Sequence, residues 1–163
     1  MEYINTAGLS DDQKMIRDTT LDLLGKHLPF DSIRQMDDDR EFPHAAYNAL
    51  AEAGFTGLFY PEEYGGAGSS HSDLTALVEA LGYYYTGIAQ AYMTTVIYAG
   101  MHIVNSGSDA MKRREIPDII SGKTKLALAM SEPGTGSDVA GRSGRSRCWA
   151  GAPRMPTKSS LRM

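Results

Sequence analysis

Residues 124–141 read "TKLALAMSEPGTGSDVAG", and the pattern of the chain changes inside this stretch. Leu126 and Leu128 alternate with small alanines, which is typical of a β-strand, and a glycine-rich turn follows. The residues before about position 120 are patterned as helices instead. This order predicts an α+β arrangement in which the β part has barely begun.

The turn after this strand concentrates groups that can bind a ligand. Glycines let the backbone approach a ligand closely, and the hydroxyls of Ser131 and Ser137 add hydrogen-bond donors. Clustered backbone amides suit a phosphate or the polar edge of a ring. The stretch is not a Walker loop, because no lysine follows, and it does not match G-x-G-x-x-G. On spacing alone, a hairpin or surface turn with a solvated Asp138 is the simpler interpretation.

The first helix has a clear start signal. Ser10–Gln13 reads "SDDQ", a capping box in which the serine hydroxyl and the glutamine side chain each satisfy a backbone amide. Ile16, Thr20 and Leu24 then follow at helical spacing, and Arg17 is expected to face away from this apolar line. The pattern predicts a helix that reaches His27.

Three further helices follow from caps and breakers. They are expected from Pro43 to just before Gly54, after a second capping box at Ser70–Asp73, and from Asp109 toward Ser121 with a perturbation at Pro117. Residues 55–69, "FTGLFYPEEYGGAGS", read as an extended turn because the apolar piece is too short for a helix.

Residues 80–108 contain no charged side chain. One interpretation is a membrane span, because the run exceeds the length that a bilayer requires. The favoured interpretation is a helix buried on all sides in a helical bundle, because glycines interrupt the run and polar residues such as Gln90, His102 and Asn105 punctuate it.

Composition narrows the function classes. The chain has 163 residues, 42% hydrophobic and 22% charged, with a net charge of −4, so neither nucleic acid nor an anionic membrane is an expected partner. The N-terminus lacks the features of a secretory signal or transit peptide, and one cysteine favours a reducing compartment. A cytoplasmic location is therefore expected. Residues 142–163 differ from the rest, because they carry six basic and no acidic side chains.

Two stretches together resemble the acyl-CoA dehydrogenase family. Residues 127–141, "ALAMSEPGTGSDVAG", resemble the family's flavin-binding signature, in which a strand leads into a T/S-E-P-x-x-G-S-D turn. Residues 57–68, "GLFYPEEYGGAG", are similar to its G-L-x-x-P-E-E-Y-G-G turn between helices. The two motifs have the family's order and spacing, and the resemblance covers residues 10 to about 140.

The resemblance implies an FAD-dependent acyl-CoA dehydrogenase, which desaturates an acyl-CoA thioester between its α and β carbons in fatty acid metabolism. The implied acyl-CoA substrate is accompanied by an electron-transfer flavoprotein or similar acceptor, and the full-length protein is expected to be a homo-oligomer. The implied fold is mostly α: a helical domain over residues 1–122, followed by the first strand and flavin loop of a β-domain over residues 123–141. The composition of residues 142–163 predicts a disordered basic tail.

The resemblance also assigns site residues. Leu128, Met130 and Ser131 correspond to positions that meet the flavin ring, largely through backbone atoms. Gly136 and Ser137 correspond to positions at the FAD pyrophosphate, and Ser137 also to a position that holds the acyl-CoA. Leu128 departs from the aromatic residue often found at its position, and Ser131 replaces the commoner threonine while keeping the hydroxyl.

No catalytic residue and no metal site are predicted. The family's catalytic base lies in a C-terminal helical domain, and no glutamate of this chain corresponds to it. The tail after Gly141 lacks the expected strand with W/F-I-T/S, and its composition favours a shifted reading frame over a nucleic-acid-binding arm. The chain is therefore expected to be an inactive N-terminal fragment. A flavin oxidase or monooxygenase of the same fold, or a non-catalytic helical binding module, remains the alternative.

Overall fold

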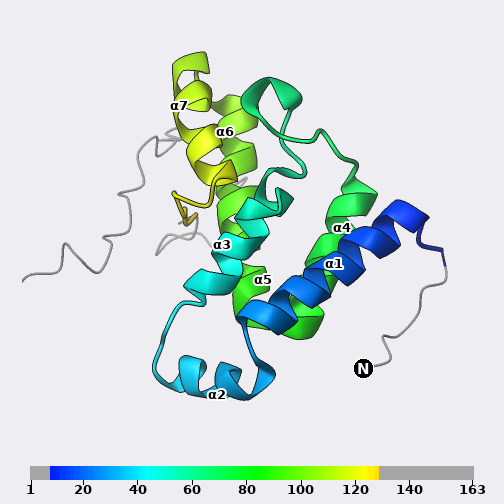
Figure 1. Ribbon diagram of the computed structural model, residues 1–163. Coiled ribbons are helices and arrows are strands. Elements are labelled where there is room, and N and C mark those ends of the chain that lie inside the picture. The colour runs from blue at the N-terminus through cyan, green and yellow to red at the C-terminus, as the bar shows by residue number, and fades with distance from the viewer. Residues whose placement is uncertain (1–7, 129–163) are drawn as a thin grey trace, which may run out of the picture.

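The computed structural model describes residues 8–128, and these residues form a helical bundle (Figure 1). Its elements, in chain order, are α1 (Asp11–His27), α2 (Phe30–Asp38), α3 (His44–Glu52), the 3₁₀ turns η1 (Phe55–Gly57) and η2 (Glu62–Tyr64), α4 (His71–Tyr84), α5 (Thr86–Tyr92), the π-helical η3 (Met93–Gly100), α6 (Met101–Ser106) and α7 (Asp109–Ile120). The predicted mostly α fold is confirmed.

Both predicted capping boxes are formed, and they bind each other. Ser10 Oγ accepts a hydrogen bond from the Gln13 amide at 3.2 Å, and Ser70 Oγ accepts one from the Asp73 amide at 3.2 Å. Gln13 Nε2 also donates to Asp73 Oδ1 at 3.1 Å, which joins the first turns of α1 and α4. These hydrogen bonds hold the pKa of Asp73 below its usual range, with the Ser70 side chain as the main cause. The two helices therefore start side by side.

The core lies where α1, α3, α4 and α5 meet. It contains fully buried apolar side chains, among them Leu24, Leu50, Leu77, Leu81 and Ile88. Helices α6 and α7 pack together at one end of the bundle, far from α2 (Figure 1). This arrangement places the end of α7, and the chain that follows it, against η1 and η3.

The prediction that Arg17 faces away from the core is wrong. Its side chain is buried, with 7% of the residue exposed. The guanidinium binds the Asp18 carboxylate, with both Nε and Nη2 at 2.8 Å from Oδ1. Arginine can lie there because its aliphatic stem packs like an apolar side chain while two of its guanidinium nitrogens bind a carboxylate.

Helix α2 was not predicted, because no capping side chain marks its start, although Phe30, Ile33 and Met36 recur at helical spacing. Its N-cap is Pro29, which makes no side-chain cap hydrogen bond, and none of its residues is fully buried. Two side-chain hydrogen bonds hold the end of the helix: the Tyr85 hydroxyl donates to Asp37 Oδ1, and Gln35 Nε2, within α2, donates to Asp39 Oδ2 at 2.8 Å.

The charge-free residues 80–108 are buried in part but do not form one helix. Tyr85 is extended, with φ −158° and ψ 114°, and separates α4 from α5. The run then passes through α5, η3 and α6. None of the helices in residues 8–128 combines the length and the hydropathy that a membrane crossing requires. The buried-helix interpretation is right for Ile88, Tyr92 and Val96, which are fully buried.

The predicted strand is not formed in residues 124–128, the part of it that the structure describes. A strand needs a neighbouring backbone to hydrogen-bond with, and no strand occurs in residues 8–128. A side chain binds this segment instead, as described below. Helix α7 runs through Pro117 to Ile120, so the expected perturbation does not end it.

Candidate functional site

The candidate site is the place where the chain leaves the bundle after α7, here called the exit segment (residues 122–128). Gly122 begins it with φ +70°, and a Cβ there would lie 2.8 Å from Ala51 Cβ on α3. The Thr124 amide donates to Asp118 O at 3.0 Å, and Thr124 is 5% exposed. The start of the segment is thus fixed by the end of α7 and by α3.

Lys125 attaches the exit segment to two aromatic rings. Its Nζ lies 4.8 Å from the centroid of Tyr47 and 5.4 Å from that of Phe42, distances that suit cation–π contacts. Nζ also donates to Gly122 O at 3.0 Å. Partial burial lowers the pKa of this lysine.

Thr95 binds both backbone groups of Leu126. The hydroxyl of this η3 residue accepts from Leu126 N at 3.2 Å and donates to Leu126 O at 3.3 Å. Thr95 is 2% exposed, so water does not compete freely for these groups. The Leu126 side chain packs against the core, whereas Leu128 is 40% exposed. The described chain therefore emerges from the bundle just after the residue that Thr95 holds.

Three buried tyrosines support this region. The Tyr60 hydroxyl donates to Val96 O in η3 at 2.9 Å, and the Tyr92 hydroxyl donates to Phe55 O at 2.9 Å. The Tyr47 side chain is fully buried beside Thr95, and Lys125 Nζ lies over the Tyr47 ring. A π-helical turn leaves room for such side-chain bonds in the middle of a helix.

The P-E-E-Y-G-G turn folds back on the residues before it. The Gly66 amide donates to Pro61 O at 3.2 Å, and the Gly68 amide donates to Tyr60 O at 2.9 Å. Just ahead of the turn, the Thr56 hydroxyl donates to Ile120 O at the end of α7. This stretch therefore braces both Tyr60 and the start of the exit segment.

The buried tyrosines predict a loss of stability at alkaline pH. Burial raises the pKa of Tyr47 to about 12, although its contact with Thr95 lowers it in part. Burial also raises the pKa of Tyr60 and Tyr92, and their tyrosine neighbours add to the rise. An unfolded tyrosine titrates near pH 10. Above that pH the unfolded state releases protons that the native state keeps, so stability is fully present below about pH 10 and falls as the pH rises.

Urea unfolding at pH 9, 10 and 11 measures this effect, with tyrosinate absorbance followed in parallel. Tyr92→Phe should reduce the fall in unfolding free energy, because one raised pKa is removed. Tyr98→Phe is the matched control, since that side chain is 42% exposed. Equal stability of the original chain at all three pH values would contradict the prediction.

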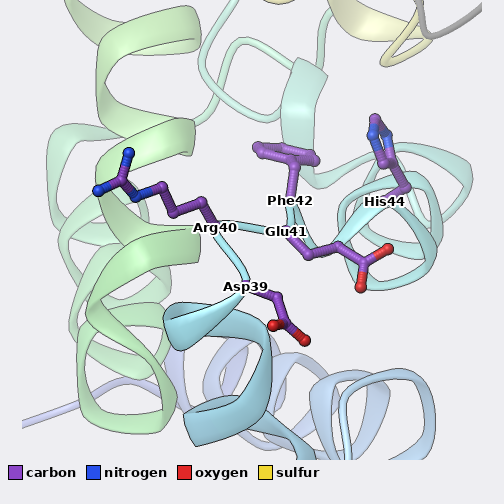
Figure 2. Close-up of a pocket in the computed structure, with 5 residues that line it drawn as sticks. All are labelled: Asp39, Arg40, Glu41, Phe42 and His44. Carbon is purple, nitrogen blue, oxygen red and sulfur yellow. The ribbon is translucent and has the colours of Figure 1, made fainter.

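A surface hollow between α2 and α3 does not have the features of a binding site. Asp39, Arg40, Glu41 and Phe42, from the loop between these helices, line it together with His44 at the start of α3. Figure 2 shows the Arg40 side chain pointing away from the carboxylates of Asp39 and Glu41. Charged side chains that point in different directions cannot bind one ligand together.

Of the predicted site residues, the structure describes Leu128, whereas Met130, Ser131, Gly136 and Ser137 lie outside the described residues. Residues 8–128 contain no group of side chains that could hold a metal ion. Sequence reasoning missed Tyr47, Thr95 and Lys125. The sequence carries no local signal for the contact of Thr95 with Leu126, because 31 positions separate the two residues.

Comparisons with known proteins agree with this description. A family model described as "Acyl-CoA dehydrogenase, N-terminal domain" matches residues 10–123. Subunit CarC of the caffeyl-CoA reductase-Etf complex from Acetobacterium woodii is 33% identical over 135 residues, which are 82% of this chain and 35% of that protein. Mitochondrial isovaleryl-CoA dehydrogenase from Pongo abelii is 31% identical, over 81% of this chain and 31% of that protein.

Among solved structures, an acyl-CoA dehydrogenase from Bacillus anthracis in complex with FAD matches with a TM-score of 0.70 and 29% identity, over 85% of this chain and 24% of that one. The chain spans about one third of the length of these curated relatives. The family model covers more than half of the chain, and the helical order of the bundle fits it. The chain belongs to the acyl-CoA dehydrogenase family.

Proposed function

We propose that this chain supplies the N-terminal helical domain (residues 1–122) and the first part of the flavin-binding segment (residues 123–141) of an FAD-dependent acyl-CoA dehydrogenase. The observation that carries the proposal is the exit segment. The bundle holds it at Lys125 and Leu126 and presents Leu128, near the start of the flavin signature, at the surface.

Among the described residues, Leu128 supports a flavin contact. Leu128 is 40% exposed, and no hydrogen bond to its backbone comes from any other residue of 8–128. Its amide and carbonyl are therefore available to the polar edge of a flavin ring. Met130 and Ser131 are proposed to continue this contact, and Gly136 and Ser137 are proposed to hold the pyrophosphate. When bound, FAD supplies the hydride acceptor for α,β-desaturation of an acyl-CoA thioester.

The role proposed for this chain is to bind and orient, with Ser137 also contacting the acyl-CoA. The exit segment carries two lysines and no carboxylate, so no proton-abstracting base is assigned to it. An electron-transfer flavoprotein as acceptor, a homo-oligomeric full-length enzyme and a cytoplasmic location belong to the same proposal. The relative in a caffeyl-CoA reductase-Etf complex supports the first, and the single cysteine supports the last.

The experiment is a titration of the purified chain with FAD and with riboflavin, followed by flavin fluorescence. We expect saturable binding that is weaker for riboflavin, because riboflavin lacks the pyrophosphate proposed to meet Gly136 and Ser137. Ser137→Ala should narrow this difference, and Ser106→Ala, an exposed serine at the end of α6, serves as the control.

Equal binding of the two flavins, or no saturable binding of either, would overturn the proposed contact. Reduction of a dye by the purified chain with any acyl-CoA would instead contradict a purely binding role. Hydrogen peroxide formed from an acyl-CoA and oxygen would favour the oxidase alternative.

A further inference from the structure

We propose that Thr95 is a positioning residue for the flavin-binding segment: its hydroxyl fixes the Leu126 backbone and so sets where Leu128 leaves the bundle. The inference rests on the proposed function and deepens it. Two contacts define the geometry, Leu126 N to Thr95 Oγ1 at 3.2 Å and Thr95 Oγ1 to Leu126 O at 3.3 Å.

The chemistry of a hydroxyl explains why the single side chain of Thr95 can bind both backbone groups of Leu126. A threonine hydroxyl has one donor and two acceptor sites, so it can bind the amide and the carbonyl of the same residue. A neighbouring strand would normally do this, but residues 8–128 form no strand. Thr95 therefore acts for Leu126 as a backbone partner would, and it does so at a site that is almost closed to water.

Thr95 is itself held in place from the other side of η3. The carbonyl of the next residue, Val96, accepts hydrogen bonds from the Tyr60 hydroxyl at 2.9 Å and from the Met101 amide. Gly100 makes this approach possible, because a Cβ there would lie 1.8 Å from the Tyr60 hydroxyl oxygen. The hydroxyl that meets Leu126 therefore projects from a fixed backbone.

The neighbouring threonine shows that the arrangement is particular to Thr95. Thr94 Oγ1 donates to Gln90 O at 2.9 Å, within its own helix, as helical threonines commonly do. Thr95 instead reaches a residue 31 positions away. Two adjacent residues of the same type thus make different contacts, which provides a matched control.

The consequence for the flavin segment is a fixed register. Leu128 follows Leu126 by two residues, so the bound backbone of Leu126 limits where Leu128 can lie. The Thr124 amide is already bound to Asp118 O at 3.0 Å two residues earlier, and the Thr95 contacts extend this directional hold to the Leu126 backbone. A slip by one residue would turn the segment over and present the wrong backbone groups to the flavin.

The experiment compares Thr95→Val, Thr95→Ser and Thr94→Val in the full chain. Hydrogen exchange of the Leu126 amide and the dissociation constant for FAD are measured for each. Thr95→Val should speed exchange at Leu126 and weaken FAD binding, each by about tenfold, which corresponds to about 1.4 kcal/mol and lies within the usual contribution of a hydrogen bond. Thr95→Ser should restore both, and Thr94→Val should change neither.

Each contrary result has a distinct meaning. Unchanged Leu126 exchange in Thr95→Val would overturn the inference. So would an equal acceleration at the Leu77 amide in the core, because the threonine would then act on general stability. Failure of the original chain to bind FAD would count against the proposed function, while the Leu126 exchange data would still decide whether Thr95 positions the segment.

Discussion

Replacing Gly66 by alanine is expected to lower the free energy of unfolding by about 3 kcal/mol or more, at or above the usual range for overpacking. A Cβ at this position would lie 2.0 Å from the Tyr60 carbonyl oxygen and 2.4 Å from its carbonyl carbon. These atoms belong to the backbone, so no change of rotamer can relieve the clash.

The surrounding hydrogen bonds prevent the Tyr60 backbone from moving aside. Its carbonyl accepts from the Gly68 amide at 2.9 Å, and its amide donates to Gly57 O at 3.2 Å. Its hydroxyl is bound to Val96 O at the far end of the side chain. A shift large enough for a methyl group would break several of these bonds together.

Gly65 is the control, because the adjacent glycine is needed for a different reason. It has φ +89°, and a Cβ there would meet one atom within 4 Å, Ile120 Cδ1 at 3.9 Å. Gly65→Ala should therefore cost only the strain of a left-handed conformation, about 1–2 kcal/mol. Gly65→Asn should cost less, since asparagine tolerates that region.

Urea unfolding followed by circular dichroism measures the three variants. The expected order of stability is Gly65→Asn above Gly65→Ala, with Gly66→Ala lowest. Equal losses for alanine at the two positions would show that conformation, and not space, governs both glycines.

A structural feature can be predicted from the sequence when the residues that cause it lie close together in the chain. The capping boxes at Ser10 and Ser70 lie within four residues each, and both were predicted correctly. The hydrogen bond between Gln13 and Asp73, which joins these boxes, spans 60 positions and was not foreseen. The charge-free run at residues 80–108 was expected to form a buried helix, and the structure divides it at Tyr85.

The same distinction applies to the candidate site, where the flavin segment was predicted and the residues that support it were not. The resemblance of residues 127–141 named the flavin segment, and Leu128 is the part of that assignment within the described chain. The supports at Thr95, Tyr47 and Lys125 come from contacts among η3, α3 and the exit segment. No pattern in one stretch of sequence can reveal such contacts, since each partner looks ordinary alone.

The P-E-E-Y-G-G stretch and the residues just before it have a structural role, because they contact both α7 and η3. Thr56, just before it, binds the carbonyl of Ile120 at the end of α7, and Tyr60 binds η3. Gly57 packs against Ile120 as well, because a Cβ there would lie 3.0 Å from Ile120 Cγ2. The turn is therefore attached to the end of α7, where the exit segment begins, and to η3, which carries Thr95.

Replacing Gly100 by alanine is expected to cost about 2–3 kcal/mol, although alanine normally stabilises a helix by about 1 kcal/mol relative to glycine. The new Cβ would lie 1.8 Å from the Tyr60 hydroxyl oxygen and 3.0 Å from Thr95 O. Tyr60 is fully buried, so its ring cannot swing into solvent. The variant must therefore displace the tyrosine or distort η3.

A double-mutant cycle identifies the cause. Tyr60→Phe removes the atom nearest to the new methyl group, so Gly100→Ala should cost less in that background than in the original chain. Gly82→Ala is the matched helical control, because nothing lies within 4 Å of a Cβ there, and it should stabilise the chain. Urea unfolding of the five chains yields the coupling energy.

The size of that coupling energy decides between two explanations of why η3 requires a glycine at position 100. If Tyr60→Phe relieves part of the cost, the tyrosine hydroxyl and the glycine form one contact, and the hydroxyl that binds Val96 O also fixes the backbone that carries Thr95. If the costs are additive, Gly100 serves the π-helical backbone alone. The Leu126 amide would then exchange at its original rate in Tyr60→Phe, because Thr95 would keep its position without the tyrosine hydroxyl.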